Sequence, residues 1–212
     1  MHPNPAFRQT PAANSLAFAR TRSFGLLMLN GEAGPLVAHV PFLLDAEGAV
    51  AELHLSRGNP ICRAALPAPA VIAVSGPDAY ISPDWYGPHE QVPDQVPTWN
   101  YVAVHLRGVL EPLPPEALRP HVDALSAEHE GRIAGKQPWT SAKMTDGAIE
   151  RLMRMILPFR FRVEAVDGTW KLNQNKEVAM RAGVVRALAT GNGGARGIAT
   201  LMREGLEGSG NP

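Results

Sequence analysis

Residues 24–55 read FGLLMLNGEAGPLVAHVPFLLDAEGAVAELHL, and this stretch decides the fold. It contains three apolar runs, over 24–29, 36–44 and 50–55, and residues typical of turns separate them. Short apolar runs joined in this way predict three consecutive strands of an antiparallel meander. Pro41 lies inside the second run and lacks a backbone N–H, so it predicts an edge, a bulge or a place where the backbone meets a ligand.

The rest of the chain continues the pattern of strands. Further strands are expected over 70–75, with an extension over 79–82, and over 98–110 and 159–166. Asp167-Gly168 predicts a two-residue hairpin that returns over 169–172. Helices are expected over 11–20, 60–66, 114–130 with a break or a fresh start near Pro120, 145–157, and twice within 176–204 around a turn at 191–194. The last seven residues are expected to fray.

About seven strands joined mostly by short turns, with helices at intervals and at the end, indicate an α+β fold. Because the βαβ rhythm of a parallel sheet is missing, we expect an antiparallel β-barrel with peripheral and C-terminal helices. A length of 212 residues fits one domain over 1–212. Within it, residues 176–206 are expected to form a helical tail.

Composition restricts the function. Lysine and arginine together number 20, as do aspartate and glutamate, so the formal net charge is zero. Dedicated DNA-binding proteins are usually basic because counterion release from phosphates supplies much of their affinity. One cysteine, Cys62, excludes an internal disulfide. No apolar run is long enough to span a membrane and no signal peptide is recognisable, so we expect a cytoplasmic protein.

Ser56-Arg57-Gly58-Asn59-Pro60 stands between a predicted strand and a predicted short helix. A helix N-terminus presents unbonded N–H groups and a partial positive charge. Gly58 allows the backbone to bend toward a ligand, Ser56 adds a hydroxyl and Arg57 a full charge, a combination suited to a monophosphate. An ordinary capped turn with a surface arginine is the alternative.

Two further segments carry polar and aromatic groups. Trp99-Asn100-Tyr101, with His105 further on, follows a proline-rich loop and could bind a flat heterocycle, or could simply anchor that loop to the barrel. Lys171-Leu172-Asn173-Gln174-Asn175 offers several amides in a small volume, or a capping turn with Asn175 as the N-cap of the last helices.

Histidines give no metal site by their spacing. His39 lies in an apolar strand, where a lone histidine is more often a core residue than a ligand. His121 and His129 are eight residues apart on a helical stretch, which matches no standard metal motif. We therefore expect no metal site.

The chain resembles the PaiB-type FMN-binding negative transcriptional regulators. Five segments match in order: His39-Val40-Pro41-Phe42-Leu43-Leu44, His54-Leu55 to Asn59-Pro60, Gly76-Pro77-Asp78-Ala79-Tyr80-Ile81-Ser82-Pro83-Asp84-Trp85-Tyr86, Val96-Pro97-Thr98-Trp99-Asn100-Tyr101-Val102-Ala103-Val104-His105, and Lys171-Leu172-Asn173-Gln174-Asn175. The resemblance covers nearly the whole chain. It implies a split β-barrel similar to that of pyridoxamine-phosphate oxidases, in which two subunits form a homodimer and each FMN lies in the groove between them.

The resemblance also implies roles for residues. Ser56, Arg57 and Asn59 would hold the phosphate of FMN. His39, Val40 and Pro41 would line the flavin ring. The site would be closed by residues of which some belong to the partner subunit: Trp99, Asn100, Lys171, Gln174 and Asn175.

The family implies an FMN-binding regulator, with or without redox activity of the flavin. The sequence identifies no catalytic residue; Tyr101 and His105 are the acid–base candidates near the expected ring. Alternatives are a flavin reductase without a regulatory role, and a haem protein with His39 or His105 as axial ligand. The arginines of the tail (Arg181, Arg186, Arg196 and Arg203) could contact DNA, although tail helices that clasp the dimer are the favoured interpretation.

Overall fold

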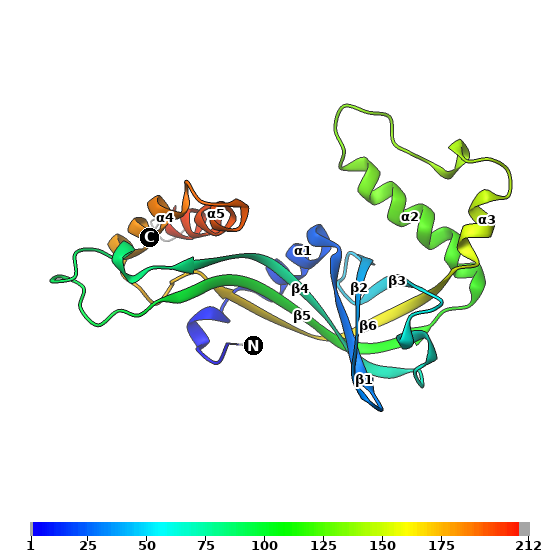
Figure 1. Ribbon diagram of the computed structural model, residues 1–212, viewed down its shortest axis with the longest axis horizontal. Helices are drawn as coiled ribbons and strands as arrows, with labels where there is room; N and C mark the ends of the chain where they lie inside the picture. Colours follow the sequence, from blue (N-terminus) through cyan, green and yellow to red (C-terminus); the bar gives the residue numbers. More distant parts are fainter. Residues whose placement is uncertain (1, 208–212) are drawn as a thin grey trace. The chain divides into compact units, whose positions relative to one another are not determined.

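Strands of the computed structural model, which describes residues 2–207, close into a β-barrel (Figure 1). The six strands within the described part are β1 (Phe24–Gly31), β2 (Gly34–Leu44), β3 (Val50–Ser56), β4 (Ala68–Ile81), β5 (Thr98–Pro112) and β6 (Ile156–Lys171). Their order around the barrel is β1-β2-β3-β6-β5-β4. The pairs β1–β2, β2–β3, β3–β6 and β1–β4 are antiparallel, which confirms the meander and the barrel expected from the sequence.

Helices and 3-10 turns connect and cover the strands. In chain order they are η1 (Pro5–Phe7), α1 (Ala12–Arg22), η2 (Pro60–Arg63), η3 (Pro83–Trp85), η4 (Pro115–Ala117), α2 (Leu118–Gly131), η5 (Ser141–Lys143), α3 (Ala148–Met153), α4 (Val178–Leu188) and α5 (Gly193–Glu207). Residues 206 and 207, expected to fray, end α5 instead, and the rest of that expectation, over 208–212, lies outside the described residues.

The chain divides into two compact units. The barrel unit comprises Leu16–Val74 and His105–Val166. The tail unit comprises, of the described chain, residues 2–15, 75–104 and 167–207. The long strands β4, β5 and β6 contribute residues to both units.

Alternating side chains fill the interior of the barrel unit. Along β1, Leu27 and Leu29 are buried, whereas Leu26 and Met28 point outward and are only partly covered. Phe42, Leu53 and Phe161 from three other strands are completely buried in the same unit. This period of two, typical of strands, makes the core.

Pro41, which has no backbone N–H, lies where β2 changes its pairing partner from β1 to β3. Pro41 is the last residue of the β1–β2 register, opposite Phe24, and the β2–β3 register begins at the next residue, Phe42. The proline therefore removes a donor at the end of one ladder rather than in the middle of it.

The hairpin predicted at Asp167-Gly168 is wrong, because β6 runs straight through both residues. Gly168 is required by a close approach: a Cβ there would lie 2.3 Å from Ser15 Oγ. Trp170 Nε1 donates to the same oxygen at 3.1 Å. In a single sequence, a glycine required by the close approach of another segment cannot be distinguished from a glycine required by a turn.

One expected helix boundary is confirmed and two differ. The fresh start expected near Pro120 is present, because η4 ends at Ala117 and α2 begins at Leu118; Pro120 is the third residue of α2, where a missing N–H costs nothing. The helix expected over 145–157 is only α3, which follows Gly147 with φ of 69°. The cap of α4 is Glu177 and not Asn175.

The two tail helices were predicted correctly. α4 and α5 contact each other (Figure 1), and Val184, Leu188, Ile198 and Met202 are buried in the tail unit. Asn192 begins α5 by accepting a hydrogen bond from Ala195 N at 2.9 Å.

Candidate functional site

The turn after β3 has the local structure expected from Asn59-Pro60. Asn59 has extended backbone angles, and its Oδ1 accepts a hydrogen bond from Ile61 N at 3.0 Å, so it caps η2. Ser56, Arg57 and Gly58 are exposed, and a Cβ at Gly58 would meet no atom within 4 Å. The turn is therefore open to a ligand, and it has both an exposed hydroxyl and an exposed cation.

Two arginines give this turn its charge. Arg57 Nε donates to the carbonyl oxygen of Arg154 at 3.0 Å, and a guanidinium has five N–H donors, so others remain for an anion. Burial raises the pKa of the Cys62 thiol, whereas the charges of Arg57 and Arg63 lower it, so both cations lie near this sulfur. Within residues 2–207 neither Arg57 nor Arg63 forms a salt bridge. The donor set fits a phosphate dianion.

The predicted residues of β2 lie in the same unit as the turn, and β2 contacts η2. Val40 is buried in the barrel and Pro41 is partly covered. His39 is exposed, so its interpretation as a core histidine is wrong; its ring stacks on that of Phe24 at 6.2 Å between centroids. A flat pair of rings thus lies on the outer surface of β1 and β2.

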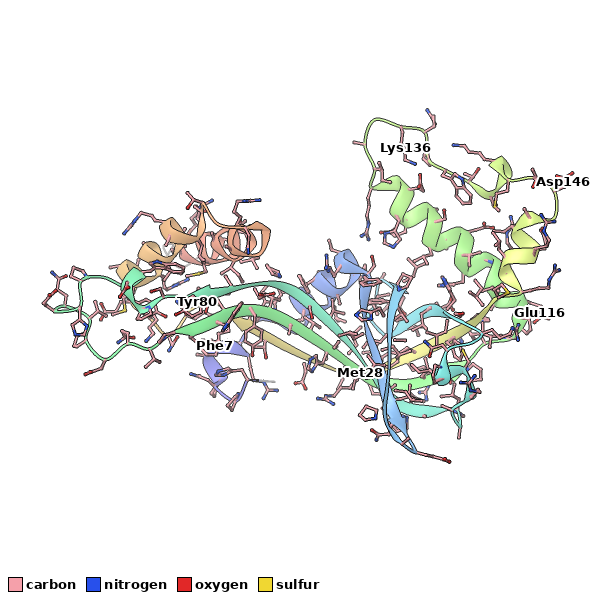
Figure 2. The ribbon with its side chains drawn as sticks, in the orientation of Figure 1. Phe7, Met28, Tyr80, Glu116, Lys136 and Asp146 are labelled. Carbon is pink, nitrogen blue, oxygen red and sulfur yellow. The ribbon has the colours of Figure 1, made fainter. Side chains whose placement is uncertain are left out.

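In the tail unit, Trp99 and Asn100 point to opposite sides of β5. Trp99 is 54% exposed and makes an edge contact with Tyr80, labelled in Figure 2. Asn100 is completely buried, and its Nδ2 donates to Met202 Sδ at 3.5 Å. Its Oδ1 is buried without a hydrogen-bond partner in the described structure. The indole faces solvent, while the amide lies against α5.

Lys171, Gln174 and Asn175 belong to the turn that follows β6. Lys171 Nζ donates to Thr98 Oγ1 and, at 2.8 Å, to the carbonyl oxygen of Trp99, which ties this turn to the start of β5. Gln174 folds back on its own turn, where its Oε1 accepts from Leu172 N at 2.8 Å and its Nε2 donates to Trp170 O.

A cavity of about 360 Å³ lies in the tail unit, and the sequence did not indicate it. Its lining combines predicted site residues with the N-terminal segment and the proline-rich loop: His2, Asn4, Phe7, Tyr86, Asp94, Gln95, Val96, Thr98, Lys171, Asn173, Asn175 and Lys176. Asn4 accepts a hydrogen bond from Ala6 N and caps η1, which is the same Asn-Pro pattern that identified the turn at Asn59. That pattern is the one sequence signal that could have drawn attention to the N-terminal segment.

His54 on β3 and His121 on α2 form a pair that sequence reasoning also missed. Their Nδ1 and Nε2 atoms are 3.1 Å apart, and His121 is buried. Burial, together with the nearby His54, lowers the pKa of His121 to about 4, and burial lowers the pKa of His54 as well. No signal in the sequence links two histidines on separate elements.

The described residues contain no group of three or more potential metal ligands. No helix among them has the length and apolar character needed to cross a membrane.

Comparisons with known proteins agree with the fold. The model of a family described as "Putative FMN-binding domain" matches residues 1–165. Over 205 residues the chain is 27% identical to protease synthase and sporulation protein PAI 2 of Bacillus subtilis, covering 95% of this chain and 96% of that protein.

Solved structures show the same fold at low identity. The FAD and haem binding protein of Mycobacterium smegmatis aligns with a TM-score of 0.56 at 18% identity, over 83% of this chain and 78% of that one. A conserved hypothetical protein of Mycobacterium tuberculosis aligns with a TM-score of 0.55 at 16% identity, over 80% of this chain and 90% of that one.

Proposed function

Because this chain belongs to the family of FMN-binding domains and is of the PaiB type, we propose that Ser56, Arg57 and Asn59 hold the phosphate of its FMN. One observation carries the proposal: two guanidinium groups without carboxylate partners in the described chain flank an exposed, capped turn. Charge-assisted hydrogen bonds from arginine to phosphate are among the strongest that a protein makes. Asn59 contributes chiefly by fixing the turn, because its Oδ1 already caps η2.

The outer surface of β1 and β2 supports the ring contact and the homodimer. In the proposal the side chains of His39 and Pro41 line the flavin ring, and Val40, whose side chain is buried in the barrel, contributes only its backbone. Phe24 is 44% exposed and Val37 is 51% exposed on the same surface, which is costly for an isolated subunit. A second copy of the chain would cover these side chains and would complete the site with residues of the tail unit: Trp99, Lys171, Gln174 and Asn175. The side chain of Asn100 is buried against α5, so it would act only by holding β5 in place.

The bound flavin would supply redox chemistry, and the protein would bind and orient it. We propose a regulatory role that depends on the flavin. We also propose a cytoplasmic location, because a chain with a single cysteine has no internal disulfide that a reducing compartment would break.

The arginines of the tail favour packing over direct DNA contact. Arg181 is buried in α4, and Arg196 Nη1 donates to the carbonyl oxygen of Gly191 at 2.6 Å within its own turn. Two of the four arginines that could reach phosphates are therefore engaged inside the tail unit. We propose that α4 and α5 stabilise the dimer, and that regulation passes through a protein or metabolite partner.

The test is the absorbance spectrum of the purified protein, with the released cofactor identified by mass. FMN bands are expected, and a Soret band would contradict the assignment. Arg57→Ala should weaken FMN retention by about 1.5–3 kcal/mol, which is roughly 10- to 150-fold in Kd. Arg151→Ala is the matched control, because Arg151 is also an exposed arginine of the barrel unit, on α3. Equal FMN affinity of the Arg57 variant and the control would refute the phosphate assignment.

A further inference from the structure

The cavity of the tail unit contains two ammonium groups held in place by neutral partners. Lys171 Nζ donates to Thr98 Oγ1 and Trp99 O, and Lys176 Nζ donates to Gln95 Oε1 at 2.6 Å. An ammonium has three donors, so each lysine retains at least one for a ligand. These oxygen acceptors carry no full negative charge. Both ammonium groups are therefore held in place, but their positive charges are not neutralised.

Charge in this cavity is unbalanced in favour of the cations. Burial lowers the pKa of Lys171, and the charge of Lys176 lowers it further, so the two ammonium groups repel each other. Neither lysine forms a salt bridge with any residue between 2 and 207. Asp94 is the one carboxylate of the lining, and it is exposed. Two cations close enough to repel each other would be stabilised by an anion between them.

Aromatic rings lie beside both lysines. Lys171 Nζ is 5.8 Å from the centroid of the Phe7 ring, labelled in Figure 2, and Lys176 Nζ is 5.3 Å from that of Tyr86. The Tyr86 hydroxyl accepts a hydrogen bond from Asn173 Nδ2 at 3.3 Å, and both residues are buried, so this ring is well fixed. The rings of Phe7 and Tyr86 are nearly buried, and together with the two lysines they line the cavity.

We propose that this cavity binds a small planar organic anion, with its carboxylate on Lys171 and Lys176 and its flat portion against Phe7 and Tyr86. The volume of about 360 Å³ lies within the usual range of small-molecule sites. The inference deepens the proposed function, on which it rests, by naming the class of the second ligand that the flavoprotein takes beside FMN.

Benzoate is the probe, and inorganic phosphate is the comparison anion that lacks a planar part. Isothermal titration of the FMN-loaded protein, in which the turn after β3 is occupied, should show saturable benzoate binding with Kd of about 0.1–1 mM, and weaker binding of phosphate. Lys176→Met should raise the Kd for benzoate at least about tenfold, the loss expected for one charge-assisted hydrogen bond. Lys143→Met is the control, since Lys143 is an exposed lysine of the barrel unit that donates to Pro138 O.

The outcomes separate this inference from the proposed function. The Lys176 variant should keep the FMN content of the unmodified protein, and Arg57→Ala should lose FMN while still binding benzoate. No saturable benzoate binding, or an equal Kd for the Lys176 and Lys143 variants, overturns the inference whatever the FMN content. Phosphate binding as tight as that of benzoate overturns the assignment of a planar ligand.

Discussion

Acidification should weaken the folded protein through His121. Its ring is buried between α2 and β3, its Nε2 lies 3.1 Å from His54 Nδ1, and its own Nδ1 has no partner in the described structure. The neighbouring charged groups are Glu52 on β3, which favours the protonated ring, and Arg160 on β6, which forms a salt bridge with Glu52 at 3.0 Å. Burial outweighs Glu52, so the pKa of His121 falls to about 4.

The sign follows from the depressed pKa of the folded state. Between pH 6.5 and pH 4 the unfolded chain binds a proton at this position and the folded chain does not, so the free energy of unfolding decreases as the pH falls and levels off below about pH 4. The difference from an ordinary value of 6.5 corresponds to about 3 kcal/mol. Because solvent screening reduces such a penalty, we expect about 2 kcal/mol.

The assay is urea unfolding at about pH 7 and pH 4 for the unmodified chain, His121→Leu and His129→Leu, the last being a partly exposed position on the same helix. Other groups titrate in all three proteins, so the quantity of interest is the difference between variants. His121→Leu should lose about 2 kcal/mol less than the other two on acidification. Equal losses in the three proteins would show that His121 is protonated as easily in the folded chain as in the unfolded one.

Two further predictions concern the scaffold. A Cβ at Gly108 would lie 1.8 Å from the backbone oxygen of Arg162, so Gly108→Ala should cost at least about 2 kcal/mol in urea unfolding. Gly131→Ala, where no atom lies within 4 Å, should be neutral or slightly stabilising, and equal midpoints for the two variants would contradict this close approach. Asn192→Ala removes the cap that bonds Ala195 N and should cost about 1 kcal/mol; a change below about 0.3 kcal/mol would show that α5 does not depend on its cap.

Local patterns predicted the elements that depend on neighbours in the chain. The apolar runs in residues 24–55 identified three strands, and Asn59-Pro60 identified the start of η2, because an apolar run and a cap each consist of consecutive residues. Asp167-Gly168 gave a wrong prediction of a hairpin, because Gly168 is required by the close approach of Ser15, more than 150 positions earlier in the chain. Such close approaches between distant segments leave no local mark.

The same distinction holds for the candidate site. The composition of the Ser56–Asn59 turn indicated an exposed cationic turn, and the structure has one. Its role toward the phosphate, like those of the other predicted cofactor residues, stays a prediction. Phe7 and Lys176 were missed, because a residue near the N-terminus and a lysine after a strand show no shared pattern until the fold brings them to one cavity. His54 and His121 were missed for the same reason.

Cys62 gives the chain a natural position for chemical labelling. It is the one cysteine in the sequence, it is half-buried, and its Sγ donates to Ser56 O at 3.3 Å beside the arginines of the turn. A thiol reagent therefore modifies one defined site, slowly at neutral pH because the thiolate is disfavoured. Without any substitution, the rate of that modification should report the fraction of the protein in which a ligand occupies the turn after β3.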